Sequence, residues 1–260
     1  MDILENIVEY KKNVIASAKK NISISNMNLH QNSRNFAEAI SLKHNKNKKN
    51  IIAEIKKSSP SKGLIMKDLN ISQIASEYEN GGATCISVLT DEKFFSGNNE
   101  NIQIAKSTTT IPILRKDFII DKYQIYESKH IGADAILLIT SILDGNTMQE
   151  FEQIAFSLGL SVLIEIHDSK ELEIAQKFTK SPLIGVNNRN LRNFEINLEN
   201  TTQMLSNFEK NRIPICESGI ETFTDIENIY QKGCTCFLIG TSIMKSENKK
   251  KFIENLLTNE

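Results

Sequence analysis

Residues 111–139 read IPILRKDFIIDKYQIYESKHIGADAILLI, and the pattern of the whole chain is already visible in them. Two short apolar runs, 111–114 and 135–139, flank a segment over 123–129 in which apolar residues recur at helical spacing. A strand, a helix and a second strand in that order form a βαβ unit with parallel strands. The stretch therefore predicts an α/β fold.

The same alternation extends in both directions from this stretch. Runs rich in Ile, Leu and Val alternate with longer helical segments such as 71–79 and 222–231. Continuously apolar runs are expected for strands that are buried on both faces of a parallel sheet. The runs lie at 51–55, 84–89, 111–114, 135–139, 161–166, 183–186, 213–216 and 235–239. Eight such units without a GxGxxG fingerprint favour a (β/α)8 TIM barrel, and an open doubly wound sheet is the alternative.

Internal similarity adds modest support for a closed barrel. IPIL at 111–114 returns as IPIC at 213–216, which is 102 residues later, and Gly132-Ala133 returns as Gly233-Cys234, 101 residues later. The third and fourth units thus resemble the seventh and eighth, as in two stacked half-barrels. Alternatively, the same kinds of residue at the starts of strands would produce this similarity by chance.

The first 50 residues do not follow the alternation. Segments 3–19 and 33–42 have the pattern of amphipathic helices, and Ser33 is placed to cap the second one. We expect an N-terminal helical extension over 1–50 that forms one domain with the barrel over 51–260. The basic run 43–49 is interpreted as a solvated linker.

The composition is that of a globular protein. Of the 260 residues, 40% are hydrophobic and 24% are charged, with a formal net charge of -1. Because the chain has no overall positive charge that would attract nucleic acid, we expect a small-molecule partner and no nucleic acid. The apolar runs are too short to cross a membrane, and the acidic start at 1–5 does not resemble a signal peptide, which predicts a cytoplasmic protein.

The cysteines give no sign of a metal site. Cys85, Cys216, Cys234 and Cys236 lie inside apolar runs, with no CxxC pair and no nearby histidine to complete a zinc site. We interpret all four as small core residues and predict no bound metal.

Polar residues interrupt or follow five of the predicted strands, at the ends where barrel enzymes carry their sites. They are Glu54 and Lys56, Arg115-Lys116-Asp117, Glu165, Asn187-Asn188-Arg189, and Glu217-Ser218-Gly219. These charges could form buried ion pairs that only hold the barrel together. Such pairs are costly to desolvate, so packing alone is a weak reason for so many of them, and we favour a functional site.

Two further loops suggest how a substrate is held. Gly219 follows the seventh run, and Gly240 and Thr241 follow the eighth, where barrels of this kind bind phosphate through backbone N–H groups. The longer polar loop over 57–67 is a candidate lid that would bring Ser59 or Lys62 to the substrate, with an ordinary loop as the alternative.

These residues lie in segments that resemble the motifs of the indole-3-glycerol phosphate synthase family, which belongs to tryptophan biosynthesis. The matching segments, in the family's order, are IAEIKKSSPSKG (52–63), PILRKDFIID (112–121), GADAILLI (132–139), LIEIHD (163–168), IGVNNRNL (184–191), ESGI (217–220) and FLIGTSIM (237–244). The resemblance covers essentially the whole chain, and the ordered set is highly specific.

The resemblance implies a carboxy-lyase that closes the indole ring of 1-(2-carboxyphenylamino)-1-deoxyribulose 5-phosphate with loss of carbon dioxide and water. It implies that Lys116 is the general acid at the ribulose carbonyl and that Glu165 is the acid/base residue of ring closure and rearomatisation. Glu54 and Lys56 match a pair that contacts the substrate and takes part in the dehydration. A cation beside a carbonyl stabilises oxyanion charge, and carboxylates accept protons, so these residue types suit the reaction.

The remaining implied roles concern binding. No metal or redox cofactor is implied. The positions that match site-lining or phosphate-binding residues are Ser59, Asn187, Arg189, Glu217 and Ser218, and the N–H groups near Gly219, Gly240 and Thr241. The anthranilate ring could contact Phe94 or Phe95, Leu137 and Leu138, with a core role as the alternative for each.

The departures from the family pattern are mild. Asn190 stands where Asp is expected and Thr241 where Ser is common, and both keep a hydrogen-bonding group. His167, two residues after Glu165, is interpreted as a loop or helix-start residue without a catalytic role.

Two other functions stay open at this point. Another phosphate-binding barrel, such as a phosphoribosylanthranilate isomerase, would need a cysteine and an aspartate as its acid/base pair. A barrel that binds a sugar phosphate without turnover would have no need for matched acids and bases. We expect a monomer, with a homodimer as the alternative.

Overall fold

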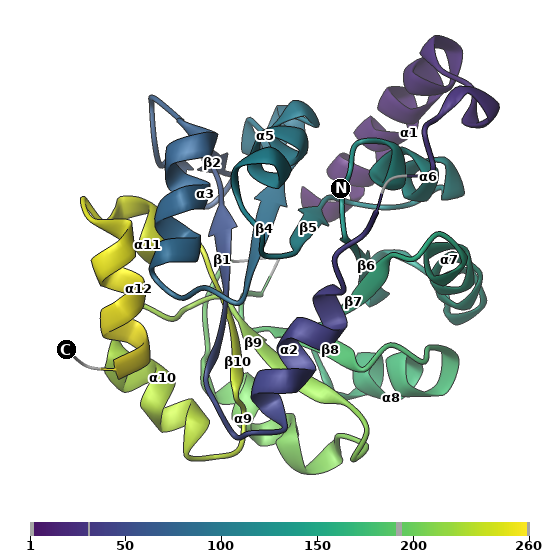
Figure 1. The fold of residues 1–260 in the computed structure, drawn as a ribbon. Coiled ribbons are helices and arrows are strands. Elements are labelled where there is room, and N and C mark those ends of the chain that lie inside the picture. Colours follow the sequence, from purple (N-terminus) through teal and green to yellow (C-terminus); the bar gives the residue numbers. More distant parts are fainter. Residues whose placement is uncertain (1–2, 31, 191–193, 259–260) are drawn as a thin grey trace.

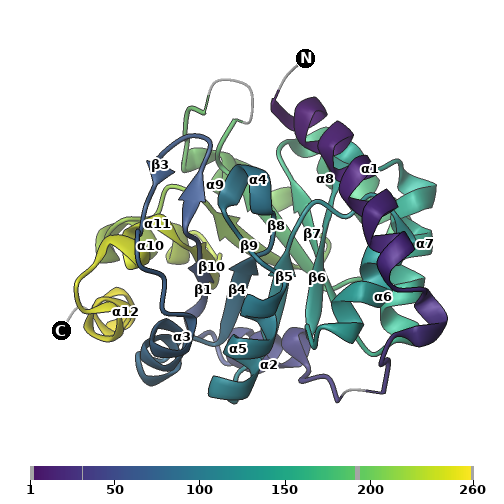
Figure 2. The ribbon, with the colours of Figure 1, turned by 90° about the horizontal axis from the view of Figure 1, so that it is seen from above.

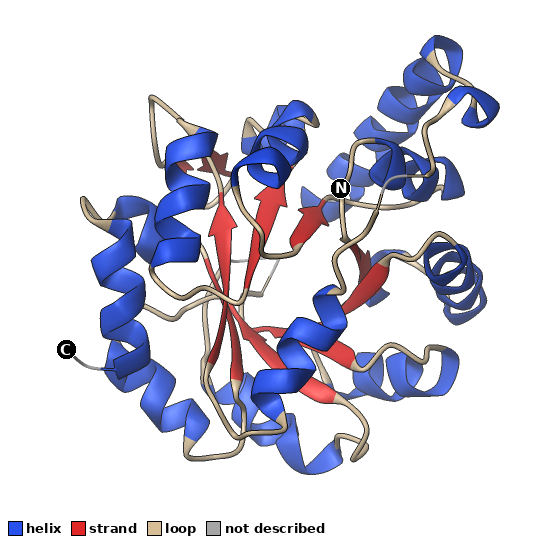
Figure 3. Cartoon of the chain, in the orientation of Figure 1, coloured by secondary structure: helices blue, strands red, loops and turns tan. Residues whose placement is uncertain are grey.

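The computed structural model describes residues 3–30, 32–190 and 194–258. Within them, eight parallel strands form a closed barrel in the order β1-β10-β9-β8-β7-β6-β5-β4, with β4 paired to β1 (Figures 1 and 3). The strands are β1 (Asn50–Ile55), β4 (Cys85–Leu89), β5 (Ile113–Lys116), β6 (Ala135–Ile139), β7 (Ser161–Ile166), β8 (Leu183–Asn187), β9 (Ile213–Glu217) and β10 (Cys236–Ile239). The predicted (β/α)8 barrel is confirmed.

Helices lie around the outside of the barrel (Figures 1 and 3). The longer ones between and after the strands are α3 (Ile71–Asn80), α5 (Glu100–Thr108), α6 (Lys122–His130), α7 (Gly145–Ser157), α8 (Ser169–Phe178), α9 (Glu199–Met204), α10 (Phe223–Tyr230) and α12 (Lys249–Thr258). Shorter helices lie in the loops, namely α4 (Glu92–Phe95), α11 (Thr241–Lys245) and the 3-10 helices η1 (Ile24–Asn26), η2 (Thr140–Ile142) and η3 (Leu205–Asn207). None of the helices in the described ranges is long and apolar enough to cross a membrane.

Successive strand residues alternate between the barrel interior and the layer under the helices. In β1, Ile52 packs inside the barrel, whereas Ile51, Ala53 and Ile55 pack against the surrounding helices. Side chains on a strand point to opposite faces with a period of two. Glu54 is therefore directed into the barrel, on the same side as Ile52.

Three strands continue further than the sequence predicted. β5, β8 and β9 include Lys116, Asn187 and Glu217, whereas the predicted strands ended at the last apolar residue. A strand end can carry a charge where its side chain points into a cavity and its backbone stays in the ladder. The side chains of Lys116, Asn187 and Glu217 are thus held by the strands of the barrel.

The second helix of the N-terminal extension closes the other end of the barrel. In α2 (Phe36–His44), Phe36 and Ile40 are fully buried against the interior residues. The helix is tied to the starts of the strands, because the N–H of Ala37 donates to Ser161 Oγ at 3.2 Å.

The helix begins later than predicted, and its cap is a different residue. Asn35, not Ser33, caps α2 by accepting a hydrogen bond from the N–H of Glu38. Ser33 instead accepts a hydrogen bond from Lys129 Nζ at 2.8 Å. Both residue types cap helices well, so the sequence could not choose between them.

The first helix, α1 (Ile3–Asn21), lies beside α6 at the rim where the strands end (Figures 1 and 2). Its Lys11 is buried, and Lys11 Nζ is 3.0 Å from Asp91 Oδ2 and 2.6 Å from Asp117 Oδ1. Burial by itself would lower the pKa of Lys11, but the charges of Asp117 and Asp91 outweigh it and raise that pKa. The ammonium thus joins α1 to the ends of β4 and β5.

We expect Lys11→Met to lower the free energy of unfolding by about 3–5 kcal/mol, because it leaves the buried carboxylate of Asp91 without its cation and leaves Asp117 with Arg115 as its remaining cation. The neighbouring Lys12 is a matched control, since its ion pair with Glu9 is exposed and Lys12→Met should cost less than about 1 kcal/mol. Urea denaturation of both variants measures the difference. Equal losses would contradict the role given to Lys11.

Candidate active site

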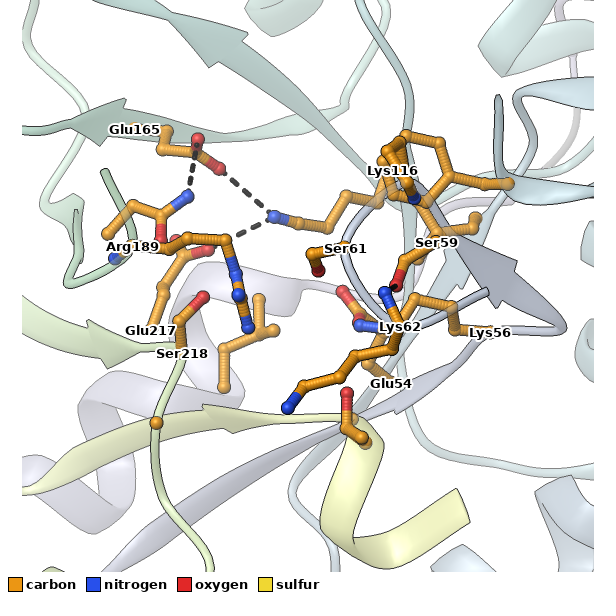
Figure 4. Close-up of a pocket in the computed structure, with 18 of the residues that line it drawn as sticks. Glu54, Lys56, Ser59, Ser61, Lys62, Lys116, Glu165, Arg189, Glu217 and Ser218 are labelled. Carbon is orange, nitrogen blue, oxygen red and sulfur yellow. Dashed lines mark hydrogen bonds and ion pairs between the residues drawn. The ribbon is translucent and has the colours of Figure 1, made fainter. Parts of the chain in front are cut away.

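A cavity opens at the carboxyl ends of the strands and encloses about 1260 Å³, including space open to solvent. All twelve residues assigned from the sequence to catalysis, polar contacts or the phosphate line it, together with Leu137, and Figure 4 shows the charged ones. They are Glu54, Lys56, Ser59, Lys116, Leu137, Glu165, Asn187, Arg189, Glu217, Ser218, Gly219, Gly240 and Thr241.

Lys116 lies at the centre of the charged groups. Its Nζ is 3.0 Å from Glu165 Oε2 and 3.1 Å from Glu217 Oε2 (Figure 4). Together with Glu54, these side chains come from β1, β5, β7 and β9, which are every second strand around the barrel. Barrels of this type fill their interior with layers of four side chains from alternate strands. In this protein, the layer that faces the cavity consists of four ionisable side chains, those of Glu54, Lys116, Glu165 and Glu217.

Lys116, Glu165 and Glu217 differ in the direction in which the site shifts their pKa values. Burial alone would lower the pKa of Lys116, but Glu165 and Glu217 outweigh it and hold that pKa above its ordinary value. Burial opposes ionisation of Glu165, yet Lys116, His167 and the amide of Asn187 keep its pKa below the usual range. Burial and repulsion by Glu165 raise the pKa of Glu217 to about 7, in spite of Lys116. At neutral pH, Lys116 and Glu165 are therefore charged and Glu217 is partly protonated.

Glu54 and Lys56 form a second charged pair on the first strand. They are two residues apart and so point to the same side, and Lys56 Nζ lies 2.5 Å from Glu54 Oε1. The carboxylate of Glu54 packs against the backbone of Gly240, where a Cβ would come within 2.5 Å of Oε1. A glycine is therefore required on β10's end for Glu54 to take this position.

Gly185 plays the same part for Glu217, and the sequence analysis did not single it out. A Cβ added at Gly185 would overlap the Glu217 carboxylate. Gly185 and Glu217 lie on the neighbouring strands β8 and β9. A glycine between Ile184 and Val186, in the middle of a strand, is the signal that could have suggested a close approach there.

Asn187 is the last residue of β8, and Arg189 follows it along the rim. Asn187 Nδ2 donates to Glu165 Oε1 at 3.1 Å, and Asn187 Oδ1 accepts from the N–H of Arg189 at 3.0 Å. Arg189 points toward the centre of the cavity (Figure 4). Asn188 faces away and donates to the backbone of Glu217, which is a structural role. Leu191, the last residue of the IGVNNRNL segment, lies outside the described residues.

The two loops expected to bind phosphate lie side by side. Ser218 and Gly219 make a tight turn with φ of 67° and 92°, and Thr241 begins α11 directly after Gly240. Ser242 Oγ donates to the carbonyl of Ile220 at 2.9 Å and so joins the two loops. Backbone N–H groups of such loops are suited to an anion.

The loop after β1 contains a small hairpin that the sequence analysis did not predict. Its strands are β2 (Ser58–Ser59) and β3 (Gly63–Leu64). Ser59 is buried, and its hydroxyl accepts a hydrogen bond from the N–H of Lys62 at 3.2 Å. Ser59 and Lys62 both line the cavity, as expected for the candidate lid (Figure 4). Whether the loop moves stays a prediction.

Apolar side chains form part of the wall. Of the residues suggested for the anthranilate ring, Phe95 and Leu137 line the cavity. Phe94 instead packs edge to face against Tyr10, and Leu138 belongs to the core between strands and helices. The sequence analysis missed Phe118 and the contribution of α1, whose Ile3, Leu4 and Ile7 also line the cavity. The amphipathic pattern of α1 predicted an apolar face but not where it would pack.

His167 lies closer to this site than the sequence analysis implied. It does follow the end of β7, yet its ring turns back so that Nε2 is 3.6 Å from Glu165 Oε1.

In the described part of the chain, no group of three or more His, Cys, Asp or Glu side chains could hold a metal ion. The arrangement offers an ammonium acid, a carboxylate base and an anion-binding rim around one cavity.

Solved structures with similar folds confirm the barrel but are distant in sequence. A thiamine phosphate pyrophosphorylase from Pyrococcus furiosus superimposes with a TM-score of 0.60 at 14% identity, over 81% of this chain and 94% of that one. A mandelate oxidase mutant gives a TM-score of 0.62 at 12% identity, over 81% and 71% of the two chains. At such identities the likeness concerns the fold alone.

Sequence comparison is far more specific. The family model described as indole-3-glycerol phosphate synthase matches residues 4–256. An indole-3-glycerol phosphate synthase of Legionella pneumophila (strain Paris) is 47% identical over 98% of both chains. One from Verminephrobacter eiseniae is 42% identical over 94% of this chain and 95% of its own. The chain therefore belongs to the indole-3-glycerol phosphate synthase family.

Proposed function

We propose that the chain converts 1-(2-carboxyphenylamino)-1-deoxyribulose 5-phosphate to indole-3-glycerol phosphate, carbon dioxide and water, and so acts as a carboxy-lyase. The observation that carries the proposal is the position of Lys116, whose ammonium lies between Glu165 and Glu217 inside the cavity. Family membership supports the same reaction.

Lys116 is assigned the role of general acid in ring closure. As the aromatic carbon attacks the ribulose carbonyl, negative charge develops on the carbonyl oxygen, and an ammonium beside it stabilises that charge and can transfer a proton. A developing alkoxide is strongly basic, so an ammonium with a raised pKa can still protonate it. The raised pKa also keeps Lys116 charged before the substrate binds.

Glu165 is assigned the role of acid/base partner. Its lowered pKa keeps it ionised and ready to accept the proton of the substrate's amine nitrogen as the ring closes, and it returns this proton when the aromatic ring is restored. The carbon that attacks the carbonyl also carries the carboxylate, and when carbon dioxide leaves, the electrons of the broken bond restore the aromatic ring. Apolar neighbours such as Leu137 and Phe95 support this step, because they hold the ring away from water.

Glu54 and Lys56 are assigned to the dehydration. Water leaves from the former carbonyl carbon, whose oxygen received the proton from Lys116. A proton leaves from the neighbouring carbon, which carries the nitrogen, and the new double bond of the indole forms between these two carbons. This step needs a proton donor at the departing hydroxyl and a base for the remaining proton. A lysine and a glutamate 2.5 Å apart can provide both.

The other lining residues are assigned to binding. Ser59, Asn187, Arg189, Glu217 and Ser218 provide polar contacts to the sugar and carboxylate groups, and Gly219, Gly240 and Thr241 provide N–H groups to the phosphate. No redox cofactor is needed for these steps, because the addition to the carbonyl, the loss of carbon dioxide and the loss of water proceed without an external oxidant or reductant.

An isomerase of the preceding pathway intermediate is less well supported. It would need a cysteine in the site, and no cysteine lines this cavity among the described residues. The thiols are buried, and burial raises the pKa of Cys216 to about 11. A thiol of that kind is a poor acid/base catalyst at neutral pH.

Lys116→Met is expected to lower turnover by several orders of magnitude, as for loss of a general acid, while phosphate affinity and the fold are retained. Indole fluorescence during incubation with the carboxyphenylamino sugar phosphate measures turnover. Lys122→Met, which removes an exposed ammonium from the start of α6, is the control. A fall in turnover of less than about tenfold would show that Lys116 is not the acid.

The raised pKa of Glu217 predicts a pH effect. Below about pH 7 Glu217 is neutral, and above it a second carboxylate faces Lys116 and makes the ammonium a weaker acid. We expect kcat/KM, which reports the groups of the free enzyme, to fall as the pH rises through 7, and we expect this fall to be absent from that range in Glu217→Gln. Comparing the two profiles cancels the titration of the substrate. Identical midpoints would argue against the assignment.

Inorganic phosphate or sulfate should bind at the rim against Gly219 and Gly240 in crystals soaked with either anion. The two glycine-containing loops lie side by side at the rim, and their backbone N–H groups can donate to an anion. Electron density for the anion at a different part of the cavity would contradict the assigned phosphate site.

A further inference from the structure

The ring of His167 links two carboxylates that lie on different elements. His167 Nε2 is 3.6 Å from Glu165 Oε1 on β7, and His167 Nδ1 is 3.1 Å from Glu171 Oε2 on α8. Glu171 is held in place, because the same oxygen accepts the backbone N–H of His167 at 2.7 Å. The imidazole therefore has a fixed orientation, with one nitrogen directed to the surface side and the other to the active site.

The geometry favours a protonated ring. Nδ1 contacts a carboxylate and so carries a proton, while Nε2 is buried and has no hydrogen-bond partner in the described structure. In a neutral ring the lone pair of Nε2 would face the carboxylate of Glu165, which is repulsive, whereas in an imidazolium an N–H faces it. Burial opposes the charge, but Glu171 and Glu165 outweigh it and raise the pKa of His167 above its ordinary value.

The groups around this array come from several elements. Around Glu165, Oε2 faces Lys116 of β5 and Oε1 accepts a hydrogen bond from Asn187 of β8, as described above. Glu217 of β9 adds a further carboxylate near His167. On the other side, Asn200 of α9 donates to the carbonyl of His167 at 3.0 Å.

We propose that His167 is a positioning residue for Glu165, a second cation that holds its carboxylate ionised and oriented while Lys116 gives up its proton. The inference rests on the proposed function and deepens it. When Lys116 protonates the carbonyl oxygen it becomes neutral, and Glu165 loses the cation on Oε2. The imidazolium on the Oε1 side remains, so Glu165 stays an oriented carboxylate that accepts the proton of the substrate's amine nitrogen as the ring closes and returns it when carbon dioxide leaves.

The first test is a titration that does not depend on turnover. The chain has four histidines, so comparison with His167→Gln assigns the His167 signals in NMR spectra. We expect the pKa of His167 to lie above 6.5 and to fall in Glu165→Gln and in Glu171→Gln. Gln at 171 keeps an oxygen that can accept the backbone N–H of His167. Glu173→Gln, which removes an exposed charge from the same helix, should leave that pKa unchanged.

The second test is the pH profile of kcat/KM for wild type and His167→Gln. Without the imidazolium, Glu165 is easier to protonate, so the acid limb should move to higher pH by about one unit, with the largest loss of activity at low pH. A merely structural role would lower activity by the same factor at every pH.

The two tests separate the possible failures. An unmoved acid limb, or a His167 pKa at or below its ordinary value, would overturn the inference. If wild type forms no indole product at all, the proposed function fails, and the NMR titration still decides whether His167 faces Glu165 as a cation.

Discussion

A lysine ammonium that is removed from water must be surrounded by opposite charge, and the site is organised by this requirement at Lys116. Glu165 and Glu217 stand at 3.0 and 3.1 Å from its nitrogen. The barrel can deliver these groups because alternate strands contribute to one layer, and β5, β7 and β9 are alternate strands. In the layer that faces the cavity, charged side chains take the place of packed apolar ones, so this end of the barrel interior can take part in acid–base chemistry.

The same layer contains the carboxyl groups of Glu54, Glu165 and Glu217 but only one ammonium, that of Lys116. Neighbouring groups and a proton compensate the excess negative charge. Lys56 pairs with Glu54, and Glu217 takes up a proton near neutral pH. Gly185 and Gly240 leave the space into which Glu217 and Glu54 fit. Charge and volume are thus balanced together, and a change in either would disturb the position of Lys116.

Much of this could be predicted from the sequence because the signals are local. Apolar runs gave the strands, and the period of two placed Glu54 and Lys56 on one side. The predicted strands ended before Lys116 and Glu217, because the sequence does not show that these side chains point into a cavity. Contacts between distant segments could not be predicted, such as Ile7 at the cavity or the ring of His167 beside Glu165, because each depends on packing that no local pattern encodes.

The N-terminal helices also have a consequence for synthesis of the protein. α2 packs on β1 and β4, which follow it closely, but other partners lie far along the chain, since Ala37 bonds to Ser161 and His44 to Thr235, 191 residues away. As the chain leaves the ribosome, the apolar face with Phe36 and Ile40 emerges long before the last of the strands that cover it. Part of this face therefore stays uncovered until late in translation, when it can take part in aggregation.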